Sequence, residues 1–104
     1  MTAATLTMGE SVLVAGVLLV AFGHANGAEK LAMADAVRRA LPDSHDETPG
    51  ETIQRVVTVL QGGATTMEGT ALDALAAALD AAPLTPGLGR AMELVHAARW
   101  RVRR

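Results

Sequence analysis

Three histidines and one acidic loop are the residues of this 104-residue chain whose types could bind a metal ion. His24, His45 and His96 are scattered along the sequence, and no His-Glu-x-x-His pair or other zinc-ligand spacing connects them. The loop Asp43–Glu47 gathers three carboxylates and an imidazole, but it lacks the alternating ligand pattern of an EF-hand calcium loop. A metal or ligand site there would need His45 and Asp46 to converge with a further polar group, so the favoured interpretation is a solvated acidic turn.

Neither nucleophilic catalysis nor phosphate binding is indicated. Ser44 directly precedes His45, and adjacent residues on a turn seldom orient a base toward a nucleophile. Gly62-Gly63 and Gly87-Leu88-Gly89 lack the Lys-Ser/Thr ending and the preceding strand of a phosphate loop. The chain has no cysteine, which removes thiolate chemistry, disulfides and cysteine-ligated zinc. We therefore expect no enzyme, with no catalytic residue, metal site or cofactor.

The residue types most typical of an interaction surface lie near the C-terminus. Successive helical residues rotate by about 100°, so a helix that faces the core with Val95 carries Trp100, the only tryptophan, on its opposite side. Exposed tryptophan flanked by arginine is enriched at interaction hot spots. The alternative is that the helix bends, Trp100 folds back over the core and the arginines only favour the negative end of the helix dipole. The predicted interaction residues are Glu93, His96, Arg99, Trp100, Arg101, Arg103 and Arg104.

The charge of the whole chain limits the partners of that surface. The formal net charge is −2, whereas a generic nucleic-acid binder normally carries a clear cationic excess. The expected partner is therefore another protein or a second copy of the chain. Binding of an anionic nucleic acid or lipid through Arg99 to Arg104 is the alternative, and it predicts steep salt dependence.

The elements that must position these residues are predicted to be helices, of which the first is the most apolar. Val12–Phe22 contains no charged residue, Thr7–Glu10 before it has the spacing of a capping box, and Gly23 follows as a possible end. A helix that is apolar on every side must be enclosed by protein or lipid. We expect it to lie at the centre of the fold, with the other helices around it.

Other interpretations of Val12–Phe22 remain open at this point. Eleven apolar residues are too few to cross a membrane, which takes about 20. Met1 to Met8 contains no Lys or Arg, unlike the start of a signal peptide. A strand remains an alternative, because periodicity does not separate a short buried strand from a buried helix. We expect no membrane span and a cytoplasmic location, with which the lack of cysteine agrees.

Four further helices follow from caps, apolar stripes and stops. Hydrophobic residues make up 50% of the chain and aromatic residues only 2%, so the core must be built from small and aliphatic side chains. Short connections favour antiparallel neighbours. The fold class is therefore all-α, a compact five-helix bundle with a central hydrophobic first helix, in a single domain over residues 1–104. The predicted starts are Thr7–Glu10, Asn26–Glu29, Thr48–Glu51, Thr65–Glu68 or Thr70–Asp73, and about Pro86; the predicted stops are Gly23, Pro42, Gly62-Gly63 and Pro83.

The turn after the first helix carries a distant resemblance. His24-Ala25-Asn26-Gly27, followed by a helix, is similar to the acidic-glycine turn of small α bundles of the tellurite-resistance type. That resemblance implies a small metal- or ligand-binding helical domain, although Asn26 stands where the family's turn has Asp. Death-domain-like adaptors are similar in chain length and helix packing, with six helices where this sequence predicts five.

The function that the sequence favours is a small soluble helical interaction module of adaptor or regulatory type. It would self-associate or dock on a protein partner. Three observations support this expectation: the lack of a catalytic constellation, the surplus of apolar residues in so short a chain, and the predicted surface around Trp100.

Overall fold

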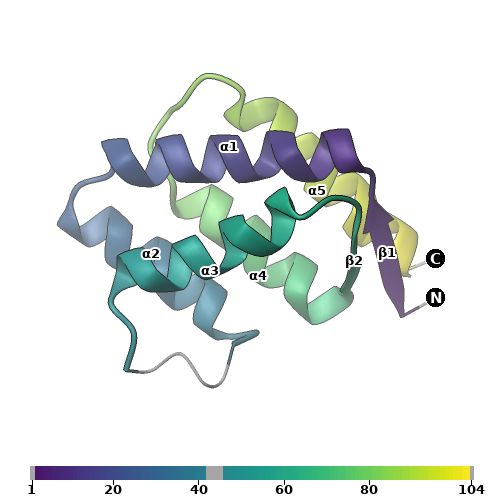
Figure 1. Ribbon diagram of the computed structural model, residues 1–104, viewed down its shortest axis with the longest axis horizontal. Coiled ribbons are helices and arrows are strands. Elements are labelled where there is room, and N and C mark those ends of the chain that lie inside the picture. Colours follow the sequence, from purple (N-terminus) through teal and green to yellow (C-terminus); the bar gives the residue numbers. More distant parts are fainter. Residues whose placement is uncertain (1, 42–45, 104) are drawn as a thin grey trace.

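The computed structural model describes residues 2–41 and 46–103. Within them the chain forms five helices and two short strands, drawn in Figure 1. The order of elements is β1 (Ala3–Leu6), α1 (Met8–His24), α2 (Gly27–Arg38), α3 (Pro49–Gln61), β2 (Thr65–Glu68), α4 (Gly69–Ala81) and α5 (Leu88–Arg103).

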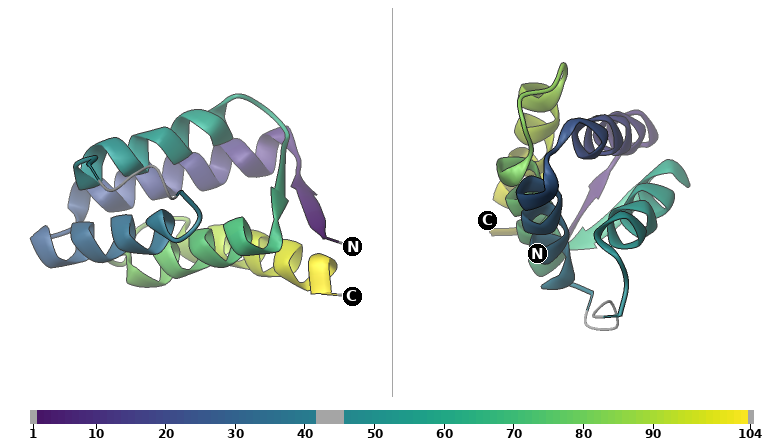
Figure 2. Two further views of the ribbon diagram at one scale, coloured as in Figure 1. Left: turned by 90° about the horizontal axis from the view of Figure 1, so that it is seen from below. Right: turned by 90° about the vertical axis from the view of Figure 1, so that its left-hand side faces the viewer.

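The helices form two layers that enclose an aliphatic core. Figure 2 shows α1 and α3 side by side in one layer, and α2, α4 and α5 in the other. The strands β1 and β2 pair at the end of the molecule where both termini lie (Figure 1). Leu18 of α1, Ile53 of α3 and Leu75 of α4 meet between the layers and are almost fully buried.

Three of the predicted helix starts are confirmed as capping boxes. Thr7 Oγ1 accepts the Glu10 N–H at 3.2 Å, and Glu10 Oε1 accepts the Thr7 N–H at 2.9 Å. Asn26 with Glu29 opens α2 in the same reciprocal way. Thr48 with Glu51 opens α3, where Pro49 occupies the first turn and its missing N–H leaves no bond unmade. Local sequence therefore sets the entry of the first three helices.

The fourth predicted start is wrong, because Thr65–Glu68 forms the strand β2. It pairs antiparallel with Ala3–Leu6, and the two threonine hydroxyls of Thr5 and Thr66 lie 2.9 Å apart across the pair. The other proposed start, Thr70–Asp73, lies inside α4. The fold is thus mostly helical with a small two-stranded sheet, and the all-α expectation is corrected at this ribbon.

The ribbon is tied to α1 by a hydroxyl chain. The fully buried Ser11 Oγ donates to Thr65 Oγ1 at 3.2 Å, and Thr65 Oγ1 donates to the Gly63 carbonyl at 3.1 Å. The Thr65 hydroxyl is therefore engaged in tertiary contacts and not in a helix cap. A buried hydroxyl with a partner avoids the desolvation penalty of an unsatisfied one.

The expectation of a central first helix is also wrong. The helix forms and runs past Gly23 to His24, but only one side of it is buried, including Val14, Leu18 and Ala21. It lies at the edge of its layer, packed on α3 and α5, and no element of the described chain covers its outer side. None of the helices in residues 2–41 and 46–103 is both long and apolar enough to cross a membrane.

Candidate functional site

The outer side of α1 is an exposed surface without a charged or hydrogen-bonding side chain. Its four central aliphatic side chains keep a large part of their area exposed: 48% for Val12, 37% for Leu13, 42% for Leu19 and 47% for Val20. At 100° per residue the residues of this surface fall within about 140° of arc on the helix. We call it the α1 face; it consists of Met8, Gly9, Val12, Leu13, Gly16, Leu19, Val20 and Gly23.

Three glycines run along the middle of the α1 face. Gly9, Gly16 and Gly23 follow one another at intervals of seven residues, which places them on one stripe of the helix. A Cβ atom built on any of them would meet, within 4 Å, no atom of the described residues beyond its chain neighbours and the adjacent backbone of α1 itself. Glycine in the middle of a helix costs about 0.5–1 kcal/mol relative to alanine, so Gly16 weakens α1 without serving any contact within the described chain.

The connection between α4 and α5 borders the α1 face. Gly87 lies so close to α1 that a Cβ atom on it would stand 3.0 Å from Cγ2 of Val17, and its positive φ of 85° also favours glycine. Leu84 in the same connection is 97% exposed. The large side chains of the α1 face expose on the order of 400 Å² of apolar surface, a size at which the largest patch of a monomer is often functional.

The predicted interaction residues lie on α5, where Trp100 is 68% exposed. Of the two orientations that the sequence leaves open for Trp100, the structure therefore has the one that faces away from the core. Glu93 pairs with Arg90 one turn before it, at 3.4 Å, on the exposed side of the helix. Arg104 lies outside the described residues.

The arginines near Trp100 are engaged with the rest of the chain. Arg99 Nε and Arg103 Nη2 both donate to Oδ1 of Asp73 on α4, at 2.7 and 2.9 Å. Arg99 also lies 3.0 Å from Nδ1 of His96, and Arg101 donates to the Thr5 carbonyl of β1 at 3.1 Å. These three arginines hold α5 against α4 and the ribbon, so they offer less free charge than the sequence predicts.

The structure brings together no set of metal ligands among the residues that it describes. In that part of the chain no group of three or more His, Cys, Asp or Glu side chains could hold a metal ion. The Oδ1 atom of Asn26, in the turn similar to that of the tellurite-resistance bundles, accepts the Glu29 N–H at 2.8 Å and so serves as a helix cap. The predicted acidic loop lies outside the described residues at Asp43, Ser44 and His45.

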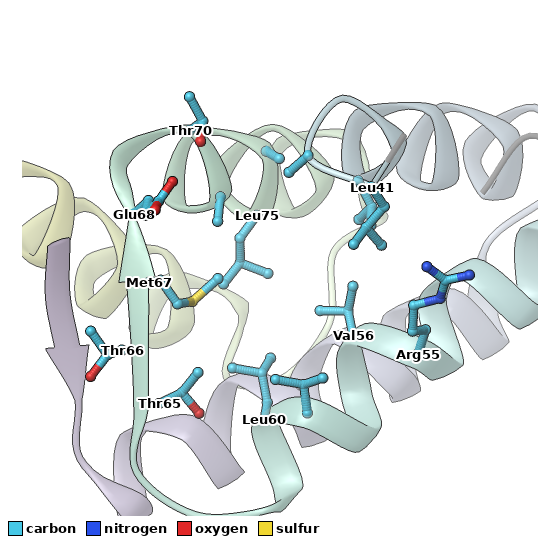
Figure 3. Close-up of a pocket in the computed structure, with 15 residues that line it drawn as sticks. Leu41, Arg55, Val56, Leu60, Thr65, Thr66, Met67, Glu68, Thr70 and Leu75 are labelled. Carbon is cyan, nitrogen blue, oxygen red and sulfur yellow. The ribbon is translucent and has the colours of Figure 1, made fainter. Parts of the chain in front are cut away.

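A cavity of about 360 Å³ opens between the end of α2, α3, β2 and α4 (Figure 3). Apolar side chains such as Val56, Met67 and Leu75 point into it. Arg55 at its edge donates to Glu47 at 2.6 Å, so its charge is already paired. The lining of the cavity is mostly apolar, and Arg55 and Glu68 are its only charged residues among those that the structure describes.

Sequence reasoning overlooked both the α1 face and the cavity. The cavity depends on β2, whose pairing with β1 joins residues about 60 positions apart and leaves no local signal. The α1 face, in contrast, has a local signal in the sequence. Glycine recurs every seven residues, with a Leu and a Val in each interval on the same side of the helix. This signal was overlooked because α1 is apolar on all sides. The exposed side of a helix is normally recognised in a sequence by its polar residues, which contrast with the buried side.

Comparison of the chain with protein-family models, with curated proteins and with solved structures finds no match.

Proposed function

We propose that this chain is a protein–protein interaction module that docks an apolar helical surface of a protein partner on the α1 face. The observation that carries the proposal is the exposure of Val12, Leu13, Leu19 and Val20 around an open glycine stripe. A patch of this size without polar groups is unfavourable in water, and its glycines weaken the helix that displays it. Close packing of a second backbone on the α1 face would remove the apolar patch from water and would make use of the space that the glycines leave open.

The chemistry of α1 supports a protein partner over a lipid surface. Helices that lie on membranes carry Lys or Arg on their polar side, which attracts anionic headgroups. Met8–His24 contains neither Lys nor Arg, and its only carboxylate is the capping Glu10. Docking on protein needs no such charge.

The end of α5 is a second surface that the sequence predicts for a partner. Trp100 supports it, because a large exposed indole gains much by burial in a complex. Binding of an anionic nucleic acid or lipid there gains less support, since Arg99 and Arg103 share the carboxylate of Asp73. A cytoplasmic location stays a prediction.

Site-specific photo-crosslinking tests the proposed function. A photoreactive amino acid is placed in the full chain at Val20, on the α1 face, or at Leu31, an equally exposed apolar residue of α2. In cells, the Val20 position is expected to give covalent adducts to a protein whose attached peptide mass spectrometry identifies, and the Leu31 position is not. Equal labelling at both positions, or no protein adduct at Val20, would contradict the proposal.

A further inference from the structure

The α1 face has a symmetry that identifies its partner. We infer that the partner is a second copy of this chain, packed antiparallel on the α1 face about a two-fold axis at Gly16. This inference rests on the proposed function and names the protein that the face binds.

Apart from Met8, whose counterpart eight residues after Gly16 is His24, the sequence of the face is the same when read outward in either direction from Gly16. Leu13 and Leu19 stand three residues away on each side, Val12 and Val20 stand four residues away, and Gly9 and Gly23 stand seven residues away. In a two-fold antiparallel pair, the half of the face before Gly16 meets the half after Gly16 in the other copy. Each half therefore meets a surface of matching composition.

The same arrangement suits the shape of the face. The glycine stripe is a shallow groove between two aliphatic ridges, Val12 with Leu19 on one side and Leu13 with Val20 on the other. Two such faces let the backbones approach at the glycines, while each Leu of one copy lies at nearly the height of a Val of the other. Small residues at helix contacts permit this close approach, as in other glycine-mediated helix pairs.

Charge also favours the antiparallel direction. Glu10 and His24 are the only titratable side chains of α1, and they lie at its opposite ends. Antiparallel packing brings the Glu10 end of one copy beside the His24 end of the other, and it opposes the two helix dipoles. Parallel packing would instead place the two Glu10 carboxylates at the same end.

The area of the face indicates how strong this dimer is. Two copies would bury about 800 Å² from the large side chains of the face, below the roughly 1,200 Å² at which standard interfaces begin. The expected dimer is therefore weak and reversible.

Disulfide trapping tests the pairing, because the chain has no cysteine of its own. Leu13 and the Val20 of an antiparallel copy lie close together, whereas two copies of Leu13 are about 9 Å apart along the axis and two copies of Val20 about 12 Å. Mixing the Leu13→Cys and Val20→Cys variants should therefore form the mixed disulfide at least tenfold faster than either variant forms one alone. The Leu31→Cys variant serves as the control for random collision.

The outcomes separate the inference from the proposed function. Faster trapping of each variant with itself than in the mixture indicates parallel packing and overturns the inference. Trapping no faster than that of Leu31→Cys, with a monomer in solution, also overturns it, while photo-adducts from Val20 to another protein would still support the proposed function. Binding of the wild-type monomer to phosphatidylcholine vesicles, abolished by Leu19→Glu, would assign the face to lipid and overturn both.

Discussion

Arg99 and Asp73 join the last two helices through a hydrogen bond of 2.7 Å between Nε and Oδ1. Arg103 donates to the same oxygen from the next turn of α5, at 2.9 Å. One carboxylate of α4 thus holds two of the residues that the sequence assigns to partner binding. At this end of α5, Trp100 is left as the side chain with the largest exposed apolar area.

The first prediction concerns the stability that this carboxylate contributes. The Asp73→Ala change removes both ion pairs, which are partly exposed, and should lower the free energy of unfolding by about 1 kcal/mol. Asp80→Ala on the same helix controls for the gain in helix propensity. Because Asp80 lies in the last turn of α4, its removal also relieves an unfavourable interaction with the helix dipole, so this change should not destabilise the fold. Denaturant unfolding measures both, and equal effects of the two changes would refute the assignment.

A second prediction follows from the capping box of α3. The hydrogen bonds that Glu51 makes with the Thr48 backbone and side chain lower its pKa below the ordinary value of 4.5. A carboxyl whose pKa is lower in the folded state stabilises the fold above pH 4.5 and loses that contribution as the pH falls through the folded pKa. Wild type should therefore exceed Glu51→Gln in thermal midpoint near neutral pH, with the gap closing in acid.

The Glu51→Gln change also removes one negative charge from the protein, so its effect on the thermal midpoint must be compared with that of another change that removes a charge. Glu68→Gln supplies it, since Glu68 stands at the N-cap of α4 and makes no side-chain capping hydrogen bond. A gap between wild type and Glu51→Gln that stays constant from neutral pH to acid would contradict the role given to Glu51.

A third prediction separates the stability of one copy from association. Gly16→Ala should stabilise the monomer by about 0.5–1 kcal/mol, because the added methyl group meets no described atom and alanine favours the helix. It should also weaken the dimer, since the methyl group stands where the second backbone approaches. Gly87→Ala is the matched contrast: its positive φ and its nearness to Val17 should make it destabilising. Unfolding of dilute protein and the mass at high concentration measure the two effects, and a Gly16→Ala variant that dimerises more tightly would argue against close packing at Gly16.

A fourth prediction distinguishes the two candidate surfaces by fluorescence. Trp100 is the only tryptophan, is exposed and lies on α5, not on α1, so its emission should resemble that of a solvated indole at every protein concentration. Acrylamide should quench it equally in monomer and dimer. A red shift of the emission on dilution would mean that self-association covers Trp100, and would move the interface to α5.

The sequence predicts those parts of the fold that depend on neighbouring residues. The capping boxes at Thr7, Asn26 and Thr48 each satisfy their bonds within one turn, so the pattern alone identifies them. The orientation of Trp100 is not settled in this way, because helical spacing alone does not exclude a bend that folds the end of α5 back over the core. Local order therefore accounts for most helix boundaries.

The rest depends on contacts between distant residues. Thr65–Glu68 has the letters of a helix cap, yet pairing with Ala3–Leu6 and the hydroxyl of Ser11 decide its structure. Asp73 stands 26 residues before Arg99, so no spacing rule connects them. An apolar run such as Val12–Phe22 specifies a helix but not which side of it the neighbours cover.

Sedimentation equilibrium over a range of concentrations tests the account most directly, on wild type and on Leu19→Glu, with Leu31→Glu as the control for an added charge. Wild type and Leu31→Glu should approach twice the chain mass of 10.7 kDa as the concentration rises through the micromolar range, and Leu19→Glu should remain at the mass of one chain. A wild-type protein that stays at 10.7 kDa up to millimolar concentration, or a dimer that Leu19→Glu leaves intact, would contradict the central claim that a second copy covers the α1 face.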